Sequence, residues 1–343
     1  MATALRVGFR SVLASALSNI HPGAGRSPGV VDLPVVKDPF GVFYVPGSGL
    51  KGALKSSLAL RLGCVSGDGE RVVCGMRREA GETECVKVEC CRLCCLLGGD
   101  IEEAPEAPSA VSVGDLYPLL VPVPSITHGF LYVTSPMLVA RAQQLAELGG
   151  SGGALAGLVE WLRQGVEGAA EGGYVLLGGS EGGEVEASLG IGSVKVRAVN
   201  AALPEEASRR LEGIASIYSL HPLQGNTLVV PDKVLPLLLE RSLVRLTRVR
   251  LKPETKTVRQ GLLWTEEYIP QFTLFAGYLA DTGLRGRPCR EVGIGGGTDA
   301  VSELTDLIGG GVFSVVVGGK ETVGKGLLRL VVETQAGGGV QGA

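Results

Sequence analysis

Apolar positions recur at helical spacing in residues 47–62. Leu50, Ala53, Leu54, Leu58 and Leu62 repeat every three or four positions, and Gly63 follows where a helix commonly ends. Ser48 stands at the start, where a serine side chain can cap the first turn. This pattern predicts one long amphipathic helix. Residues 136–148, which begin with a proline, and residues 299–308 predict two more helices.

Other stretches are rich in apolar and β-branched residues and predict strands; they are residues 5–13, 117–124, 129–134, 312–317 and 327–332. Residues 247–263 alternate between apolar and polar positions, and Pro253 and Glu254 separate the two halves. This segment predicts a long β-hairpin. The order strand–helix–strand, used twice with insertions between, predicts an α+β fold with a ferredoxin-like (RRM-like) core.

The same patterns divide the chain. We expect the core to be built from residues 1–63, 111–148, 190–240 and 262–335. Interruptions of this pattern predict a cysteine-rich insertion (64–110), a glycine-rich acidic surface insertion of modest order (149–189), a projecting hairpin (241–261) and a flexible tail (336–343).

Composition limits the class of protein. Of 343 residues 45% are hydrophobic, yet no uninterrupted run of about 20 predicts a membrane span. Arg6 and Arg10 interrupt the first apolar stretch, which argues against a signal peptide and predicts a cytoplasmic protein. The net charge of −3 gives no general attraction to nucleic acid.

Charge is nevertheless concentrated in the predicted hairpin. Seven basic residues and one acidic residue, Glu254, lie between positions 241 and 259: Arg241, Arg245, Arg248, Arg250, Lys252, Lys256 and Arg259. Such a stripe can follow a phosphate backbone. A solvated hairpin face is the alternative.

A glycine-rich turn, residues 318–326, joins the last two predicted strands. Gly318, Gly319, Gly324 and Gly326 allow close approach of a ligand to the backbone, and Lys320 and Lys325 add positive charge, which indicates a phosphate-bearing partner. The turn almost spells a nucleotide-binding P-loop. That motif requires Ser or Thr and a helix next, whereas Gly326 and a predicted strand follow, so a nucleotide-dependent enzyme is the weaker hypothesis.

Seven of the eight cysteines are crowded into residues 64–95, and Cys289 stands apart. Cys91 and Cys94 have the spacing of half a zinc knuckle, and Cys74 and Cys85 can supply the other ligands. We therefore expect a structural zinc site with four thiolates. Reduced thiols or partial disulfide pairing are the alternatives, and disulfides are the weaker explanation for a protein that is not secreted.

Several motifs resemble the RAMP superfamily of CRISPR RNA-binding proteins. The first two are the helix start Gly47-Ser48-Gly49-Leu50-Lys51-Gly52 and the late glycine-rich turn. Residues 21–34, 122–136 and 261–270 further resemble the backbone subunits of type III effector complexes, and favour the Cmr (III-B) branch. Residues 36–39 and the cysteines before Leu96 are also similar to the Csm (III-A) subunit, which is the close rival.

The resemblance implies a subunit that stacks with further copies of itself in a helical filament along a CRISPR RNA. It also implies other effector subunits and a complementary target RNA as partners. A hairpin thumb, here about residues 247–261, would interrupt the duplex, and a loop aspartate beside it, here Asp32, would promote cleavage with Mg²⁺ or Mn²⁺. The residues expected to bind RNA are His21, Ser48, Lys51, Lys55, Arg248, Arg250, Lys252, Lys256, Arg259, Gly318, Gly319, Lys320 and Lys325.

Some roles stay open at this stage. His21 can contact RNA or serve a structural purpose, Asp38 before Pro39 is typical of a turn former, and Asp32 can instead cap its loop. A purely structural RNA-binding subunit, without cleavage, is the alternative function.

Overall fold

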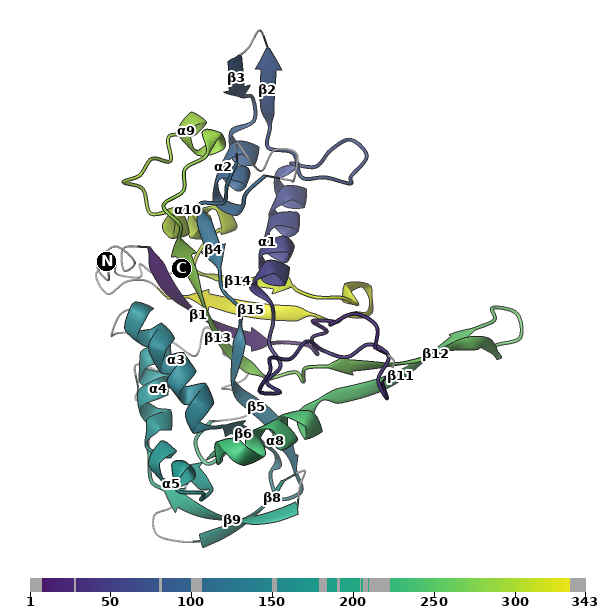
Figure 1. Ribbon diagram of the computed structural model, residues 1–343, viewed down its shortest axis with the longest axis vertical. Helices are drawn as coiled ribbons and strands as arrows, with labels where there is room; N and C mark the ends of the chain where they lie inside the picture. Colours follow the sequence, from purple (N-terminus) through teal and green to yellow (C-terminus); the bar gives the residue numbers. More distant parts are fainter. Residues whose placement is uncertain are drawn as a thin grey trace.

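One large mixed sheet runs through the molecule (Figure 1). The computed structural model describes residues 8–27, 29–79, 82–99, 107–149, 153–178, 184–189, 192–203, 205, 209 and 223–333. Within this part of the chain, the strands follow the order β14-β15-β1-β13-β5-β6-β10-β7-β9-β8, and β4 pairs with β13. The half from β14 to β6 is antiparallel, whereas β10 pairs parallel to β6 and β7 parallel to β9.

The strands of this sheet are β1 (Phe9–Ala16), β4 (Val111–Val113), β5 (Tyr117–Ser125), β6 (Gly129–Thr134), β7 (Val175–Leu177), β8 (Glu184–Leu189), β9 (Gly192–Val199), β10 (Thr227–Val229), β13 (Leu274–Asp281), β14 (Val312–Val316) and β15 (Leu327–Val332). Two separate hairpins pair β2 (Met76–Glu79) with β3 (Glu82–Cys85) and β11 (Val244–Leu251) with β12 (Val258–Tyr268).

The helices are α1 (Gly47–Leu62), α2 (Val88–Leu97), α3 (Pro136–Gly149), α4 (Ala154–Arg163), α5 (Val166–Ala170), α8 (Leu235–Ser242), α9 (Arg287–Glu291) and α10 (Ala300–Ile308), with 3₁₀ turns η3 (Asp232–Val234) and η4 (Glu321–Val323). In Figure 1, α1, α2, α9 and α10 lie at one end of the molecule and α3, α4 and α5 at the other.

Both faces of the central sheet are covered, which explains why every residue of β1 is buried. Val12 and Ala14 belong to a core with α1, α2 and α10, whereas Leu13 belongs to a second core with α3 and α4. Successive side chains of a strand point to opposite faces, so β1 separates the two cores. The structure therefore has the mixed α+β class that the sequence predicts. The ferredoxin-like arrangement of the core stays a prediction.

Local signals placed several elements correctly. β6 and β15 have the predicted bounds. α1 ends at Leu62 and is capped by Gly63, whose φ of 64° is the left-handed conformation of a helix C-cap. The Asp299 side chain accepts a hydrogen bond from Val301 N and so caps α10. The first strand lies later than predicted, at Phe9–Ala16, and residues 1–7 and the tail 336–343 lie outside the described part of the chain.

The predicted cap of α1 was wrong. Pro46, not Ser48, is the N-cap residue, and Ser48 lies exposed inside the first turn. The carboxylate of Asp115 takes the capping role, because its Oδ1 accepts a hydrogen bond of 2.7 Å from Gly47 N. A side chain 68 positions away thus satisfies the helix end.

The expectation of a surface insertion over residues 149–189 was also wrong in its described part. Helix α4 places Leu155, Leu158, Trp161 and Leu162 in the second core, where each is 0% exposed. The glycines and acidic residues around this segment concealed the apolar face of α4, which packs against α3 and β1. Residues 179–183 lie outside the described part.

The zinc prediction is corrected by the sulfur pairing. All eight cysteines form disulfides: Cys64–Cys90, Cys74–Cys94, Cys85–Cys91 and Cys95–Cys289. Cys74, Cys85, Cys91 and Cys94 therefore carry no thiolate for a metal. The last bridge ties α2 to α9, so the cysteine-rich segment is fixed to the segment after β13.

No helix in the described residues is long and apolar enough to cross a membrane.

Candidate nucleic-acid interface

Three segments that are far apart in the sequence meet at the base of the thumb, which is the hairpin β11–β12. They are the loop after β1, the glycine-rich turn (318–326) and strand β12. Gly319 N donates to His21 O at 3.1 Å, and Leu33 N donates to Thr265 O at 3.0 Å. The loop after β1 therefore holds the turn on one side and the thumb on the other.

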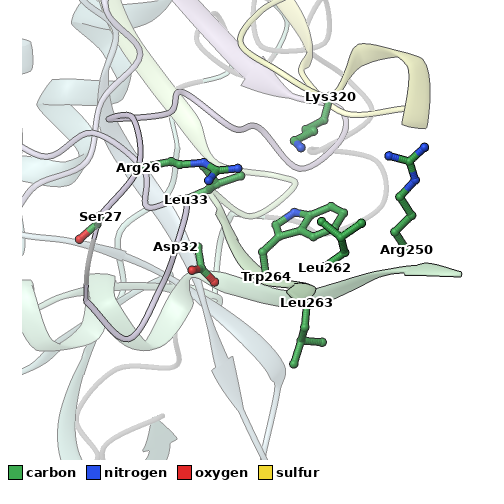
Figure 2. A pocket seen from close by; sticks show the side chains of 9 residues that line it. All are labelled: Arg26, Ser27, Asp32, Leu33, Arg250, Leu262, Leu263, Trp264 and Lys320. Carbon is green, nitrogen blue, oxygen red and sulfur yellow. The ribbon is translucent and has the colours of Figure 1, made fainter. Parts of the chain in front are cut away.

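A cavity of about 520 Å³ opens where these segments meet. It is lined by Arg26, Ser27, Asp32, Leu33, Arg250, Leu262, Leu263, Trp264 and Lys320 (Figure 2). The thumb projects away from the sheet (Figure 1), and it contributes Arg250, Leu262, Leu263 and Trp264 to the cavity lining. The loop aspartate, the cationic hairpin and the glycine-rich turn therefore share one site.

Asp32 is exposed but held firmly in place. Its Oδ2 accepts a hydrogen bond of 2.7 Å from Thr265 N, and its backbone oxygen accepts one from Ser27 N at 3.0 Å. Among the described residues, no hydrogen bond to Oδ1 accompanies these two. One carboxylate oxygen thus anchors the side chain to β12, and the other stays open to a ligand.

Three basic side chains line the same cavity as this carboxylate. Arg26 and Arg250 are exposed and line the cavity from the loop and from the thumb. Lys320 enters from the glycine-rich turn, and Figure 2 shows its side chain directed toward Trp264. Three cations from three segments give a surface that attracts an anionic backbone.

Glu266 is a buried residue of β12 that links the glycine-rich turn to the thumb through an ion pair with Lys320. It is only 1% exposed, and its carboxylate is 2.7 Å from Lys320 Nζ and 3.3 Å from Arg248 Nε. Trp264 Nε1 donates to it at 2.6 Å, and the Tyr268 hydroxyl also donates to it. Burial alone would raise the pKa of Glu266, but the hydrogen bonds from Lys320, Tyr268 and Trp264 and the charge of Lys320 outweigh it and lower the pKa to about 2.

The glycine-rich turn needs glycine where it touches the loop. Gly318 has a φ of +82°, and a Cβ there would lie 2.5 Å from His21 O. Two strands, β14 and β15, flank the turn, and only the short 3₁₀ turn η4 lies inside it. Because no helix follows, the P-loop hypothesis lacks the structural context that it requires.

His21 lies under the turn rather than on its surface. It is 6% exposed, its Nδ1 is 2.6 Å from the backbone oxygen of Glu267, and its ring packs against Tyr268. This geometry favours the structural role over direct RNA contact. Asp38 accepts hydrogen bonds from Phe40 N and Val42 N, as expected for a turn former.

The basic residues of the thumb divide into two groups. Arg250, Lys252 and Lys256 are exposed, and the last two flank the turn at Pro253–Thr255. Arg248 is instead engaged with Glu266. The side chain of Arg259 lies outside the described part of the chain.

The start of α1 does not contribute to the cavity lining. Ser48 is exposed, whereas Lys51 and Lys55 are half-buried. Burial, and then the neighbouring charge of Lys55, lowers the pKa of Lys51. Of the two glycine-containing motifs, the glycine-rich turn contacts the thumb through Lys320. The start of α1 instead contacts Asp115.

The protein side chains near Asp32 do not by themselves supply enough ligands for a metal site. Within the described residues, no three histidine, cysteine or carboxylate side chains are grouped to hold an ion. Mg²⁺ or Mn²⁺ ordinarily takes about six oxygen ligands. Asp32 offers one carboxylate, and one of its oxygens is already bound to Thr265 N.

No pattern in the sequence assigned a role to Arg26, Trp264 or Glu266. The signal for the last two was the spacing Trp264, Glu266, Tyr268, because residues two apart on a strand share a face. That face meets Lys320 only in the folded chain. Arg26 stands in an irregular loop and carried no pattern.

A family model described as the RAMP superfamily matches residues 14–329. The chain belongs to the RAMP superfamily. It is 28% identical over 320 residues to a protein named CRISPR system Cmr endoribonuclease Cmr4 from Pyrococcus furiosus, which covers 92% of this chain and 93% of the relative. A second relative, the CRISPR system CMR subunit Cmr4 from Saccharolobus solfataricus, is 34% identical over 113 residues, 31% of this chain and 32% of the relative.

Two solved structures share the fold of this chain. A chain of the type III-B Cmr-beta complex bound to cognate target RNA superposes with a TM-score of 0.66 at 23% identity, covering 94% of this chain and 96% of that one. A chain of oligomeric Cmr4 from Pyrococcus furiosus gives a TM-score of 0.55 at 19% identity, covering 95% and 98%. At these identities the likeness establishes the fold alone.

Proposed function

We propose that this protein is a Cmr (III-B) type backbone subunit that coats a CRISPR RNA and cleaves the paired target RNA. Membership of the RAMP superfamily and similarity to Cmr4 over most of the chain support this assignment. The single observation that carries the cleavage proposal is the position of Asp32, anchored to Thr265 N at the root of the thumb inside a cationic cavity.

Each segment has a distinct task in this proposal. Lys252, Lys256 and Arg250 on the thumb bind phosphates, which holds an RNA strand without reading its bases. The glycine-rich turn brings Lys320 and Lys325 to the same strand. Base pairing with the guide then selects the target, so the protein needs no base-specific contacts. Other copies of the chain and further effector subunits are the proposed protein partners.

Cleavage within RNA requires attack by a 2′-hydroxyl on the adjacent phosphorus, with loss of the hydroxyl proton and departure of the 5′-oxygen. In this proposal the Oδ1 of Asp32, whose Oδ2 is held by Thr265 N, accepts a hydrogen bond from the attacking hydroxyl and then its proton, while the departing 5′-oxygen takes a proton from water. Arg26 and Arg250 can stabilise the negative charge that develops on the phosphate oxygens. Both roles use side chains that line the cavity.

Mg²⁺ or Mn²⁺ is the cofactor we propose for this reaction. Since the protein supplies too few ligands, RNA oxygens and water would have to complete the coordination. Titration of Mg²⁺ into an EDTA-treated complex tests this part separately, because metal-independent cleavage would remove the cofactor while leaving Asp32 in its role.

The decisive experiment compares Asp32→Asn with the wild-type chain in a reconstituted effector complex. We expect guide and target binding to remain and target cleavage to fall by a factor of about 100 or more, as for loss of a catalytic base. Asp306→Asn, an exposed aspartate on α10, is the matched control. Unchanged cleavage in the Asp32 variant would contradict the proposal. A wild-type complex that binds but does not cut would favour the alternative, a non-catalytic structural subunit.

A further inference from the structure

Helix α2 carries four of the eight cysteines, and each of them is bonded to a cysteine in a different segment. Two bridges lie within the core that contains α1 and α10; these inner bridges are Cys64–Cys90 and Cys95–Cys289. The outer bridges lie outside that core and are Cys74–Cys94 and Cys85–Cys91. The inner bridges therefore belong to the packing of the core, whereas the outer bridges attach a peripheral segment.

The outer bridges hold both ends of the hairpin β2–β3. Cys74 lies two residues before β2, and Cys85 is the last residue of β3. Their partners, Cys94 and Cys91, lie one turn apart on α2. In Figure 1 the hairpin projects from the end of the molecule where α1, α2 and α9 lie. Its covalent attachment to α2 consists of these two bridges.

The four bridges differ in their accessibility to a reductant. Cys85 is half-buried, whereas the other seven cysteines are at most 1% exposed. Thiol–disulfide exchange requires that the attacking thiolate reach a sulfur, so exposed bridges are the labile ones. A thiol in solution therefore attacks Cys85 Sγ first, and the Cys91 thiolate is the leaving group.

The sulfur that this step releases lies beside the second outer bridge. Cys91 and Cys94 are three positions apart on α2, so their Cα atoms are about 5 Å apart, which suits a disulfide. Cys94 is 0% exposed, so a thiol on the same helix reaches it when one in solution does not. Cys95 is farther from Cys91, at about 6 Å between Cα atoms, and its bridge is packed in the core.

We propose that a dithiol releases both ends of the hairpin β2–β3 in a single two-electron reduction. One thiol of the reductant bonds to Cys85 Sγ, and the Cys85–Cys91 bond breaks. The Cys91 thiolate then attacks Cys94 Sγ, forms a Cys91–Cys94 bond and expels the Cys74 thiolate. The second thiol of the reductant resolves the mixed disulfide at Cys85. The reductant becomes a disulfide, its two protons end on Cys74 and Cys85, and the protein keeps three bridges.

This exchange makes the attachment of one surface element depend on the thiol redox state. The oxidised protein ties the hairpin to α2 at both ends, and the reduced protein ties it at neither. The inner bridges join α2 to Cys64 and Cys289 in both states, so the fold is kept. The inference uses no contact with RNA and stands independently of the proposed function.

Mapping of the bridges during reduction tests this proposal. The native full-length chain is treated with one equivalent of dithiothreitol, alkylated with N-ethylmaleimide and digested with trypsin. We expect the label on Cys74 and Cys85 and a new Cys91–Cys94 bond. Trypsin cuts after Arg92, so this bond joins two peptides that the original pairing leaves unconnected.

Three results would overturn the proposal. They are label on Cys85 and Cys91 with the Cys74–Cys94 bridge intact, label first on an inner bridge, and resistance of all bridges to excess dithiothreitol under native conditions. The double variant Cys74→Ser/Cys94→Ser is the matched control. It lacks the acceptor sulfur, so Cys91 should now be labelled together with Cys85. A Cys91 that stays unlabelled in this variant would show that burial, rather than capture by Cys94, protects it.

Hydrogen exchange measures the release of the hairpin itself. After one equivalent of dithiothreitol, the amides of β2 and β3 should exchange roughly tenfold faster or more, whereas those of β1 keep their rate. Unchanged exchange in the hairpin would contradict the proposal, because the outer bridges would then not be what fixes it.

Discussion

Lys320 Nζ lies 2.7 Å from Glu266 Oε1, and this ion pair joins the glycine-rich turn to the root of the thumb. Lys320 has a φ of 73°, so a non-glycine residue in the left-handed conformation directs its side chain onto a carboxylate that is 1% exposed. Neither residue is close to the other in sequence. This ion pair holds the glycine-rich turn against the thumb.

Removing the lysine should destabilise the protein. In Lys320→Ala, the buried Glu266 keeps Arg248, Trp264 and Tyr268 but loses its nearest cation, which should lower the free energy of unfolding by about 2 kcal/mol. Urea unfolding measures the change. Lys325→Ala is the matched control. Among the described residues, the contact of its side chain is with the Tyr268 ring, whose centroid lies 5.5 Å from Nζ, so its loss should cost about 0.5–1 kcal/mol. Equal losses in the two variants would contradict the role of the ion pair.

The low pKa of Glu266 predicts a particular acid sensitivity. Its pKa is lowered from its ordinary value of 4.5 to about 2, so between these values the unfolded chain binds the proton that the folded chain does not. The stability from this group is complete above pH 4.5 and is lost as the pH falls toward 2. Urea midpoints between pH 5 and pH 2.5 should therefore fall less steeply in Glu266→Gln than in the wild type. Parallel slopes for both proteins would count against this assignment.

Two adjacent glycines in the turn should differ sharply in tolerance. Gly318→Ala places a methyl group 2.5 Å from His21 O at a φ of +82°, and should cost more than about 1 kcal/mol and weaken RNA binding. At Gly319, the nearest atom to a new Cβ is 3.6 Å away and φ is outside the left-handed region, so Gly319→Ala should be mild. Unfolding by urea and RNA binding by filter retention check the pair. Similar effects of both substitutions would argue against close packing of the turn on His21.

The cysteine pairing can be counted chemically. Protein purified without reductant and denatured in guanidinium should show no free thiols, and eight after reduction, because all eight cysteines are paired. Ellman's reagent measures the number, and metal analysis of the same sample is the companion assay. Free thiols together with stoichiometric zinc would restore the metal interpretation.

Local sequence patterns predicted the bounds of an element correctly where its conformation depends on its own residues. The bounds of β6 and β15 and the stop of α1 at Gly63 follow from apolar spacing and from the conformational freedom of glycine. The prediction of Ser48 as the N-cap of α1 was wrong because the side chain that accepts the hydrogen bond from the helix start, Asp115, comes from a distant segment. Helix α4 was missed because its apolar face is short and surrounded by glycines.

Motifs in the sequence determined the family, the hairpin and the presence of Asp32 beside a cationic surface. Only the tertiary structure decided that Thr265 anchors Asp32, that Lys320 reaches Glu266 and that Trp264 lines the same cavity as Asp32. Those contacts join residues up to 233 positions apart, and no local pattern encodes which distant backbone N–H a carboxylate will meet. The sulfur pairing has the same origin, because several pairings suit one spacing and only the packing of α2 against α9 selects Cys289 for Cys95.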